Sequence, residues 1–302
     1  MTKEFFKGGS LMLHTLNNGV LKIKATARGA ELKSITALKD GTEYLFDADP
    51  TWWKYSSPVL FPIVGKVLNN TYRAEGKEFT LGQHGFARTS NFWLVDVTNT
   101  LITFALESNA ATLAVYPYRF RLEISYELIG NEVKVLWKVI NVDEKEIYFS
   151  IGAHPAISCP LCFGETFEDC YLKFNVAEKS ARLLLTDNGL SHERIPTLEG
   201  TELNLNYELF KNGVLVFDDL KSDEISVCSR KSSKSLTIRA KNFPYWGFWT
   251  PAQGGAPFIC VEPWIGHADY IDFKGELKDK EGIQKLAVSE IFTAEMSFIV
   301  NN

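Results

Sequence analysis

The chain has 302 residues, of which 45% are hydrophobic and 23% are charged, and its formal net charge is −5. This composition is that of a folded protein with enough apolar material for a large core, and it excludes a disordered chain. The charges are spread along the chain without a long basic run, which argues against a nucleic-acid surface and favours a neutral or weakly charged small ligand.

Short segments with alternating apolar and polar residues recur along the chain, and this period of two predicts strands with one solvent-facing side. Turn signals that contain Gly separate several of them, at residues 17–19, 39–41, 75–77 and 130–131, and they favour antiparallel hairpins. The expected strands are residues 11–16, 20–26, 31–37, 92–97, 101–107, 120–128, 132–140, 146–150, 171–175, 182–185, 214–217, 224–229, 235–240, 245–250, 258–261 and 290–300.

Helical signals are few and short. Residues 49–55 and 279–286 are expected to form helical turns, and neither is long enough to be a packing layer. No internal repeat occurs, whereas a propeller would show a period of several tens of residues. We therefore expect an all-β fold, a large antiparallel β-sandwich that spans residues 1–302 as one domain.

The N-terminal ten residues contain charges and glycine but no apolar stretch of signal-peptide length. No segment approaches the ~20 apolar residues of a membrane helix. We expect a cytoplasmic protein with no membrane segment, either a monomer or a homodimer.

Three of the five cysteines, Cys159, Cys162 and Cys170, lie close together and allow a zinc site with His154 as fourth ligand. A structural zinc site usually has two closely spaced pairs of ligands, and the second pair is missing here. Reduced thiols in a cytosolic enzyme are the better interpretation, so no metal is expected.

The histidine in Gly-Ala-His-Pro, residues 152–155, follows an expected strand directly. Gly152 can adopt backbone conformations that are closed to other residues, and the proline biases His154 toward extended geometry. Such a restrained backbone suits a side chain that must contact a ligand. An ordinary half-buried histidine near a turn is the alternative. His84 before Gly85 and Glu262 before Pro263 have a similar setting, and a carboxylate beside histidines can form an acid and base pair near neutral pH.

Aromatic residues gather at residues 243–249, where alternation places Tyr245 and Trp249 on one face of a strand and Trp246 and Phe248 on the other. Such rings bind the apolar faces of sugars, and they equally fill the core of a large sandwich. Both interpretations stay open at this point.

Other catalytic templates are absent from the sequence: a nucleophile elbow, a dinucleotide-binding turn, a phosphate-binding Gly-rich loop and a His-Glu-x-x-His motif. Glu262 with Asp218 or Asp269 would give the paired acids of glycoside hydrolysis. Because the chain has 37 acidic residues, such pairs arise easily by chance.

Three motifs together resemble the aldose 1-epimerases (galactose mutarotase-like proteins), and most of all their LacX-type bacterial branch. They are Gln-His-Gly-Phe-Ala-Arg at residues 83–88, Gly-Ala-His-Pro-Ala at 152–156 and Val-Glu-Pro-Trp at 261–264. Phe-Pro-Ile-Val-Gly at 61–65 adds to the likeness, which spans essentially the whole chain.

The resemblance implies a β-supersandwich that interconverts the α and β anomers of a hexose or hexose phosphate without metal or organic cofactor. Glu262 would take the proton of the C1 hydroxyl, and His154 would protonate the ring oxygen. His84 would bind the sugar near that oxygen, and Arg88 would hold a hydroxyl or a phosphate. The aromatic candidates for contact with the sugar, one in each of two motifs, are Phe86 and Trp264.

The sequence departs from the family at two positions. Residues 65–70 read Gly-Lys-Val-Leu-Asn-Asn where many mutarotases carry Gly-Arg-x-x-Asn-Arg, so Lys66 is the candidate cation, without the bidentate fork of arginine. Asp218 is the candidate for the family's sugar-binding aspartate. These departures keep two other functions open: a non-catalytic carbohydrate-binding sandwich, and a polysaccharide lyase or hydrolase of the same architecture.

Overall fold

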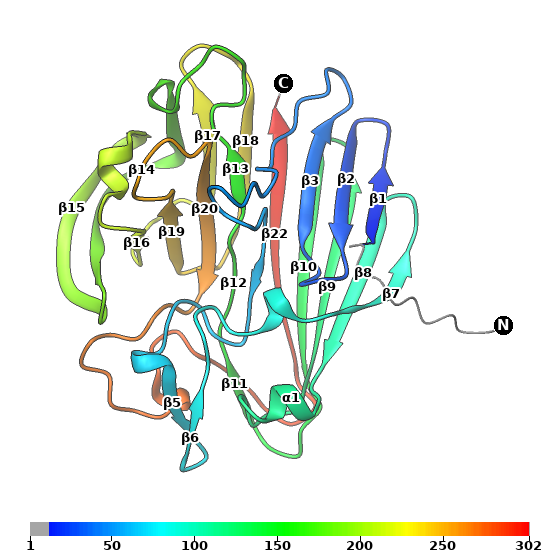
Figure 1. The fold of residues 1–302 in the computed structure, drawn as a ribbon, viewed down its shortest axis with the longest axis vertical. Coiled ribbons are helices and arrows are strands. Elements are labelled where there is room, and N and C mark those ends of the chain that lie inside the picture. The colour runs from blue at the N-terminus through cyan, green and yellow to red at the C-terminus, as the bar shows by residue number, and fades with distance from the viewer. Residues whose placement is uncertain (1–11, 302) are drawn as a thin grey trace.

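One antiparallel sheet of 15 strands runs through most of the computed structural model, which describes residues 12–301 (Figure 1). Its main path has the order β4-β12-β20-β19-β16-β14-β17-β18-β22-β10-β9-β8-β7, with β13 beside β20 and β15 beside β14. A second sheet, β1-β2-β3, packs over β8 and β9, where the Tyr126 hydroxyl donates to the Ala30 carbonyl at 2.7 Å. The expectation of a large antiparallel β-sandwich is confirmed.

The strands of the first half are β1 (Leu13–Asn17), β2 (Leu21–Thr26), β3 (Leu32–Ala37), β4 (Val59–Leu60), β5 (Thr71–Ala74), β6 (Lys77–Thr80), β7 (Trp93–Val97), β8 (Leu101–Glu107), β9 (Phe120–Ile129), β10 (Glu132–Asn141), β11 (Ile147–Phe149) and β12 (Ile151–Ala153). Those of the second half are β13 (Ala156–Ser158), β14 (Cys170–Thr186), β15 (Gly189–Asn204), β16 (Leu215–Phe217), β17 (Glu224–Ser229), β18 (Ser235–Arg239), β19 (Tyr245–Trp249), β20 (Phe258–Ile265), β21 (Gln284–Leu286) and β22 (Ile291–Asn301). Every helix among the described residues has three or four residues: η1 (Leu68–Asn70), η2 (Ala87–Thr89), α1 (Ala110–Leu113), η3 (Phe167–Asp169), η4 (Tyr207–Phe210) and η5 (Leu277–Asp279).

Three of the predicted turns join antiparallel hairpins: β1 with β2, β5 with β6, and β9 with β10. The fourth, at residues 39–41, reverses the chain after β3, where Thr36 and Glu43 form an isolated antiparallel bridge. Residue 11 of the first predicted strand lies outside the described residues. The predicted helical turns are wrong, because residues 49–55 form turns without a helix and residues 279–286 begin at the end of η5 and finish in β21.

The two predicted strands at 171–175 and 182–185 are parts of one 17-residue strand, β14. Its partner β15 was not predicted. β15 reads Gly-Leu-Ser-His-Glu-Arg-Ile-Pro at its start and buries only three of its 16 residues, so it lacks the apolar alternation of a half-buried strand.

Strands β19 and β20 are buried on both faces, and this arrangement creates the floor of the site. Ile259, Val261, Trp246 and Phe248 point into the main hydrophobic core. The other face of β20 carries Cys260, Glu262 and Trp264, since successive side chains alternate. The predicted alternation, with Tyr245 and Trp249 on one face and Trp246 and Phe248 on the other, is confirmed by this division.

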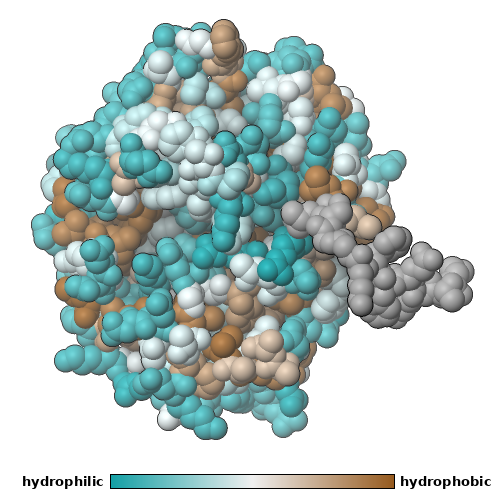
Figure 2. Space-filling model, viewed as in Figure 1, coloured by the Kyte–Doolittle hydropathy of each residue, from teal (hydrophilic) through white to brown (hydrophobic). Residues whose placement is uncertain are grey.

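The face of the molecule seen in Figure 2 is mostly hydrophilic, with apolar residues in small scattered groups. Between residues 12 and 301 no helix has the length and apolar character needed to cross a membrane.

Candidate functional site

Glu262 and His154 lie against one another at the centre of the site. Gly152 of β12 pairs with Trp264 of β20, and β12 ends at Ala153, so the next side chain, His154, reaches the face of β20 that carries Glu262. The distance from His154 Nε2 to Glu262 Oε2 is 3.1 Å. Both are almost fully enclosed, with exposed fractions of 8% and 1%.

His84 forms the third side of this arrangement. Its ring lies 5.4 Å from the ring of His154 at 89°, and its Nδ1 accepts the Gly65 N–H at 3.0 Å. Neutral His84 therefore carries its hydrogen on Nε2. His84 has φ of 65°, and a Cβ on Gly85 would come within 2.3 Å of the Phe61 carbonyl oxygen, so only glycine fits the turn that presents this imidazole.

Burial dominates the electrostatics of these groups. It raises the pKa of the Glu262 carboxyl well above its usual value, although the Trp264 indole N–H opposes the shift. It lowers the pKa of His154 to about 3, with a further contribution from the positive charge of Arg88. The pKa of His84 is also well below its usual value, through burial first and the charge of His154 second.

Both Glu262 oxygens and His154 Nδ1 are buried without a hydrogen-bond partner of good geometry among the described residues. An unsatisfied buried polar group costs about 1–3 kcal/mol, so such groups are rare in a folded protein and mark functional sites. These atoms can therefore accept hydrogen bonds from the donor groups of a ligand.

A cavity of about 1660 Å³ opens above these groups. Six of the predicted site residues line it or its floor: Lys66, His84, Arg88, His154, Glu262 and Trp264. Its outer walls are the turn of the β14–β15 hairpin, residues 184–190, and the loops at 211–214 and 251–253. Ligand pockets usually measure about 300–1,000 Å³, so a hexose fits with room to spare.

Trp53 and Trp249, which sequence reasoning did not select as site residues, form an aromatic wall beside His154. The Trp53 ring lies 4.6 Å from the imidazole, and the Trp249 ring lies 5.7 Å from it. Glu31 holds the loop after Trp53, because its carboxylate accepts the N–H groups of Ser56 and Ser57 at 2.6 and 3.1 Å. The Trp-Trp pair at residues 52–53 was the available signal, in a segment interpreted as a helical turn.

The two predicted cations lie at the rim. Arg88 donates from Nη2 to the Gln83 carbonyl at 2.8 Å, and its guanidinium lies 5.3 Å from the Tyr55 ring. Lys66 is exposed at the mouth of the cavity. Both line the same cavity as Glu262.

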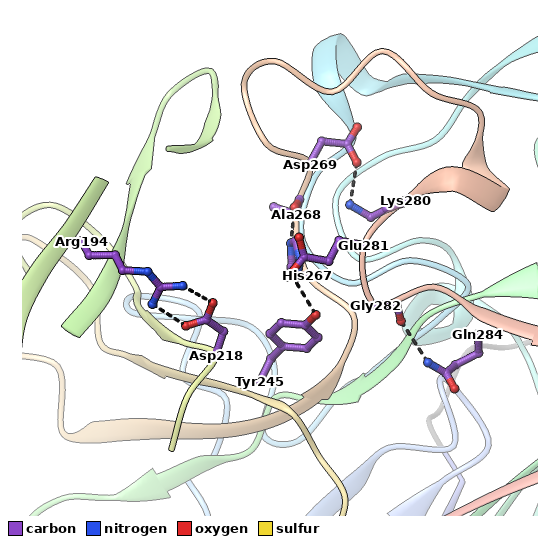
Figure 3. A network of polar contacts seen from close by, with 10 residues as sticks. All are labelled: Arg194, Asp218, Tyr245, His267, Ala268, Asp269, Lys280, Glu281, Gly282 and Gln284. Carbon is purple, nitrogen blue, oxygen red and sulfur yellow. Dashed lines mark hydrogen bonds and ion pairs between the residues drawn. The ribbon is translucent and has the colours of Figure 1, made fainter. Parts of the chain in front are cut away.

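Asp218, the predicted sugar-binding aspartate, does not line the cavity. Its carboxylate accepts two hydrogen bonds from Arg194, at 2.8 and 2.6 Å, within the polar network of Figure 3. Asp269 of the same network is bound by Lys280 at 2.5 Å and by the Leu68 N–H at 3.0 Å. Neither carboxylate therefore completes the acid pair of a glycoside hydrolase with Glu262 in this structure.

Phe86, the predicted aromatic contact, belongs to the core instead. Its ring stacks on Phe120 at 5.9 Å and lies 6.2 Å from Phe61, and it does not line the cavity. The motif at residues 83–88 thus contributes His84 and Arg88 to the site, and Phe86 to the packing beneath them.

All five cysteines are free thiols. One group of possible metal ligands is found among the described residues, and it joins His154 and Glu262 with Cys260, not with Cys159, Cys162 or Cys170. The zinc arrangement considered from the sequence is therefore not the one that the fold brings together.

Comparisons with known proteins found relatives that match most of the chain. The family model described as aldose 1-epimerase matches residues 12–284. The chromosomal LacX protein of Lactococcus lactis subsp. lactis is 37% identical over 281 residues, which cover 90% of this chain and 93% of LacX.

Two solved structures are similar over nearly their whole length. The galactose mutarotase related enzyme of Lactobacillus acidophilus has 31% identity and a TM-score of 0.91, covering 96% of this chain and 98% of the other. A galactose mutarotase-like protein of Lactobacillus casei has 29% identity and a TM-score of 0.89, covering 96% of this chain and all of the other, 100%.

Proposed function

Because the chain belongs to the aldose 1-epimerase family, we propose that it interconverts the α and β anomers of a hexose or hexose phosphate by opening and closing the sugar ring. The observation that carries this proposal is the 3.1 Å contact between His154 and Glu262 on the floor of a cavity large enough for a hexose. Ring opening needs one group that accepts a proton and one that donates a proton, and these two groups supply both.

When no sugar is bound, the pair holds one exchangeable proton. Burial disfavours charge on both groups, so the proton resides on the Glu262 carboxyl and leaves His154 neutral. A bound sugar supplies hydroxyl donors to the unpartnered Glu262 oxygens and stabilises the carboxylate, so that the proton moves to His154.

Ring opening then follows in one exchange. Glu262 takes the proton of the C1 hydroxyl, His154 gives its proton to the ring oxygen, and the bond between C1 and that oxygen breaks. The product state again has a neutral imidazole and a protonated carboxyl, which is the state that burial favours. After rotation about the bond between C1 and C2, the same steps in reverse close the ring on either face of the aldehyde.

The surrounding residues position the sugar. We assign the Nε2–H of His84, whose nitrogen lies 3.1 Å from the Gln83 side-chain amide, as the donor for the ring oxygen. Trp53 and Trp249 offer flat apolar surfaces to the C–H faces of the sugar. Arg88, Lys66 and Trp264 line the space around it. Asp218 and Phe86 have no direct part in this proposal, because neither lines the cavity.

The test is the relaxation of optical rotation after freshly dissolved α-glucose, α-galactose or a hexose 6-phosphate is mixed with the protein. We expect faster relaxation than in buffer for at least one of these sugars. A rate equal to that in buffer for all of them contradicts the proposal.

Magnetisation-exchange NMR separates the enzyme from a protein that only binds sugar. An enzyme accelerates exchange between the α and β signals, whereas a binding protein broadens or shifts them without added exchange. Glu262→Gln is the matched variant, because it keeps the shape of the side chain and removes the proton acceptor.

A further inference from the structure

Cys260 lies beside the reacting pair and has no part in the sugar reaction described above. It stands two residues before Glu262 on β20, so both side chains leave the same face of the strand. The thiol is fully buried, with an exposed fraction of 0%, among Phe258, Trp53 and Trp249.

The Cys260 Sγ, one ring nitrogen of His154 and one carboxylate oxygen of Glu262 all lie within 4.8 Å of one another. Thiolate, imidazole and carboxylate are the ligands that zinc takes in proteins, and sites with three protein ligands keep a fourth position open. Neither Glu262 oxygen has a hydrogen-bond partner of good geometry among the described residues, and the close contact of Oε2 is with His154, itself one of the three ligands.

We propose that Cys260, His154 and Glu262 form a binding site for a thiophilic divalent cation such as Zn²⁺, and that this cation inhibits the enzyme. Binding is a property of the three side chains alone. Inhibition rests on the proposed function, because the cation occupies the two groups that exchange protons with the sugar. The thiol proton is released to solvent when the sulfur binds the metal.

The geometry needs only a small adjustment. Bonds of about 2.0–2.3 Å to a tetrahedral zinc ion place its ligand atoms roughly 3.3–3.8 Å apart. The contact between His154 Nε2 and Glu262 Oε2 is already 3.1 Å, and the remaining atoms close by up to about 1.5 Å (4.8 − 3.3), through side-chain rotation. Arg88 opposes an added cation by its charge, while the thiolate and the carboxylate each bring a negative charge.

The direct test uses Co²⁺ as a spectroscopic substitute for Zn²⁺ on the full chain after treatment with a chelator. Cobalt bound by a thiolate gives an intense near-ultraviolet charge-transfer band, and tetrahedral cobalt gives strong visible bands. We expect both in the parent protein, and we expect added Zn²⁺ to abolish them. Absence of the bands at excess Co²⁺ overturns the proposal.

Single substitutions identify the side chains that bind the metal. Cys260→Ser should lose the charge-transfer band, whereas Cys228→Ser, which alters a partly buried thiol on β17, should keep it. A band that persists in Cys260→Ser, or disappears in Cys228→Ser, overturns the assignment. If Cys260→Ser does not fold, Glu262→Gln is the test of the site instead. This variant retains the thiol and should weaken Zn²⁺ binding by at least about tenfold.

Inhibition by the metal is measured separately from metal binding. Zn²⁺ should slow the relaxation of optical rotation, and a chelator should restore it. A protein with the cobalt bands but no epimerase activity contradicts the proposed function alone, and an active protein without the bands contradicts the metal site alone.

Discussion

Glu262 combines its proposed catalytic position with an unfavourable environment. It is the least exposed of the three titratable groups at the floor of the cavity, and burial favours its protonated form. A group whose pKa is raised by folding stabilises the native state fully below its unfolded pKa, and this stability is lost as the pH rises through the folded pKa. At pH 8 the buried Glu262 carboxyl therefore lowers the free energy of unfolding.

Glu262→Gln should consequently lower the epimerase rate by about 10²- to 10⁴-fold and raise the free energy of unfolding at pH 8. The gain in stability should shrink at pH 5, where the parent carboxyl is protonated in the native state. Denaturant unfolding at the two pH values, beside the rate, checks this. Equal stability of parent and variant at pH 8 would contradict the role of burial.

His154 has the opposite pH dependence. Its pKa in the native state is about 3, so its contribution to stability is present above the unfolded pKa and is lost as the pH falls toward 3. His154→Gln should therefore lose less stability than the parent between pH 7 and pH 5. His192→Gln, on an exposed histidine, is the control and should follow the parent. A parent and a His154→Gln variant with the same acid slope would count against the prediction.

At the scale of elements, sequence reasoning located most strands because their alternation is set by local burial. β8 and β17 have the predicted bounds. β15 was missed because its polar sequence pairs with β14 and projects beyond the packed part of the sheet, where no apolar face is required.

The sequence predicted His154 and Glu262 as site residues and left open whether the aromatic residues at 243–249, which include Trp249, contact a sugar. Trp53 was not predicted. His154 and Glu262 each stand beside a proline in a short motif, so they leave a sequence signal. Trp53 lies in a loop whose position depends on Glu31, a contact between distant segments that no local pattern reveals. Asp218 was selected by type, but Arg194, 24 residues away in sequence, holds its carboxylate.

The contact between β19 and β20 depends on Gly247. A Cβ there would lie 2.5 Å from the Trp264 ring, which forms part of the cavity wall. Gly247→Ala should displace Trp264, cost about 1–3 kcal/mol of stability and raise KM. Gly82→Ala meets no atom within 4 Å and should change stability by less than about 0.5 kcal/mol. Thermal unfolding and steady-state kinetics measure both, and equal effects would show that the close approach to Trp264 is unimportant.

A buried ion pair links three segments around the cavity. Asp269 is bound by Lys280, its second oxygen accepts the Leu68 N–H, and its carbonyl accepts the Leu190 N–H at the start of β15. Both side chains are nearly fully buried.

Lys280→Met leaves the Asp269 carboxylate without its cation and should cost about 3–5 kcal/mol of unfolding free energy. The double variant Asp269→Leu with Lys280→Met should be more stable than Lys280→Met alone, because no charge is left unpaired. Chemical denaturation of the two proteins is the measurement. A double variant less stable than the single one would contradict this account.

At the scale of the whole molecule, the site lies on the face of β19 and β20 that points away from the main core. The core fixes the backbone of both strands through Trp246, Phe248 and Val261, and the opposite face is left to hold polar groups. That residues 1–302 fold as one domain stays a prediction, although a continuous sheet from β4 to β7 supports it.

β22 holds the two parts of this sheet together, since it pairs with β18 on one side and β10 on the other. A chain that ends at residue 290 should show no cooperative unfolding transition by circular dichroism, because β10 and β18 lose their shared partner. As a control, Glu295→Ala removes only an exposed side chain and its ion pair with Lys134 and should unfold cooperatively. Cooperative unfolding of the shortened chain would disprove the central role of β22.

The place of β22 also has a consequence during protein synthesis. Ile140 of β10 pairs with Ile291, which the ribosome adds 151 residues later (291 − 140). At roughly 5–20 residues per second, about 8–30 s pass between the synthesis of Ile140 and that of Ile291. Throughout that interval an unpaired strand edge is open to other nascent chains, so we expect folding in the cell to benefit from chaperones that shield such edges.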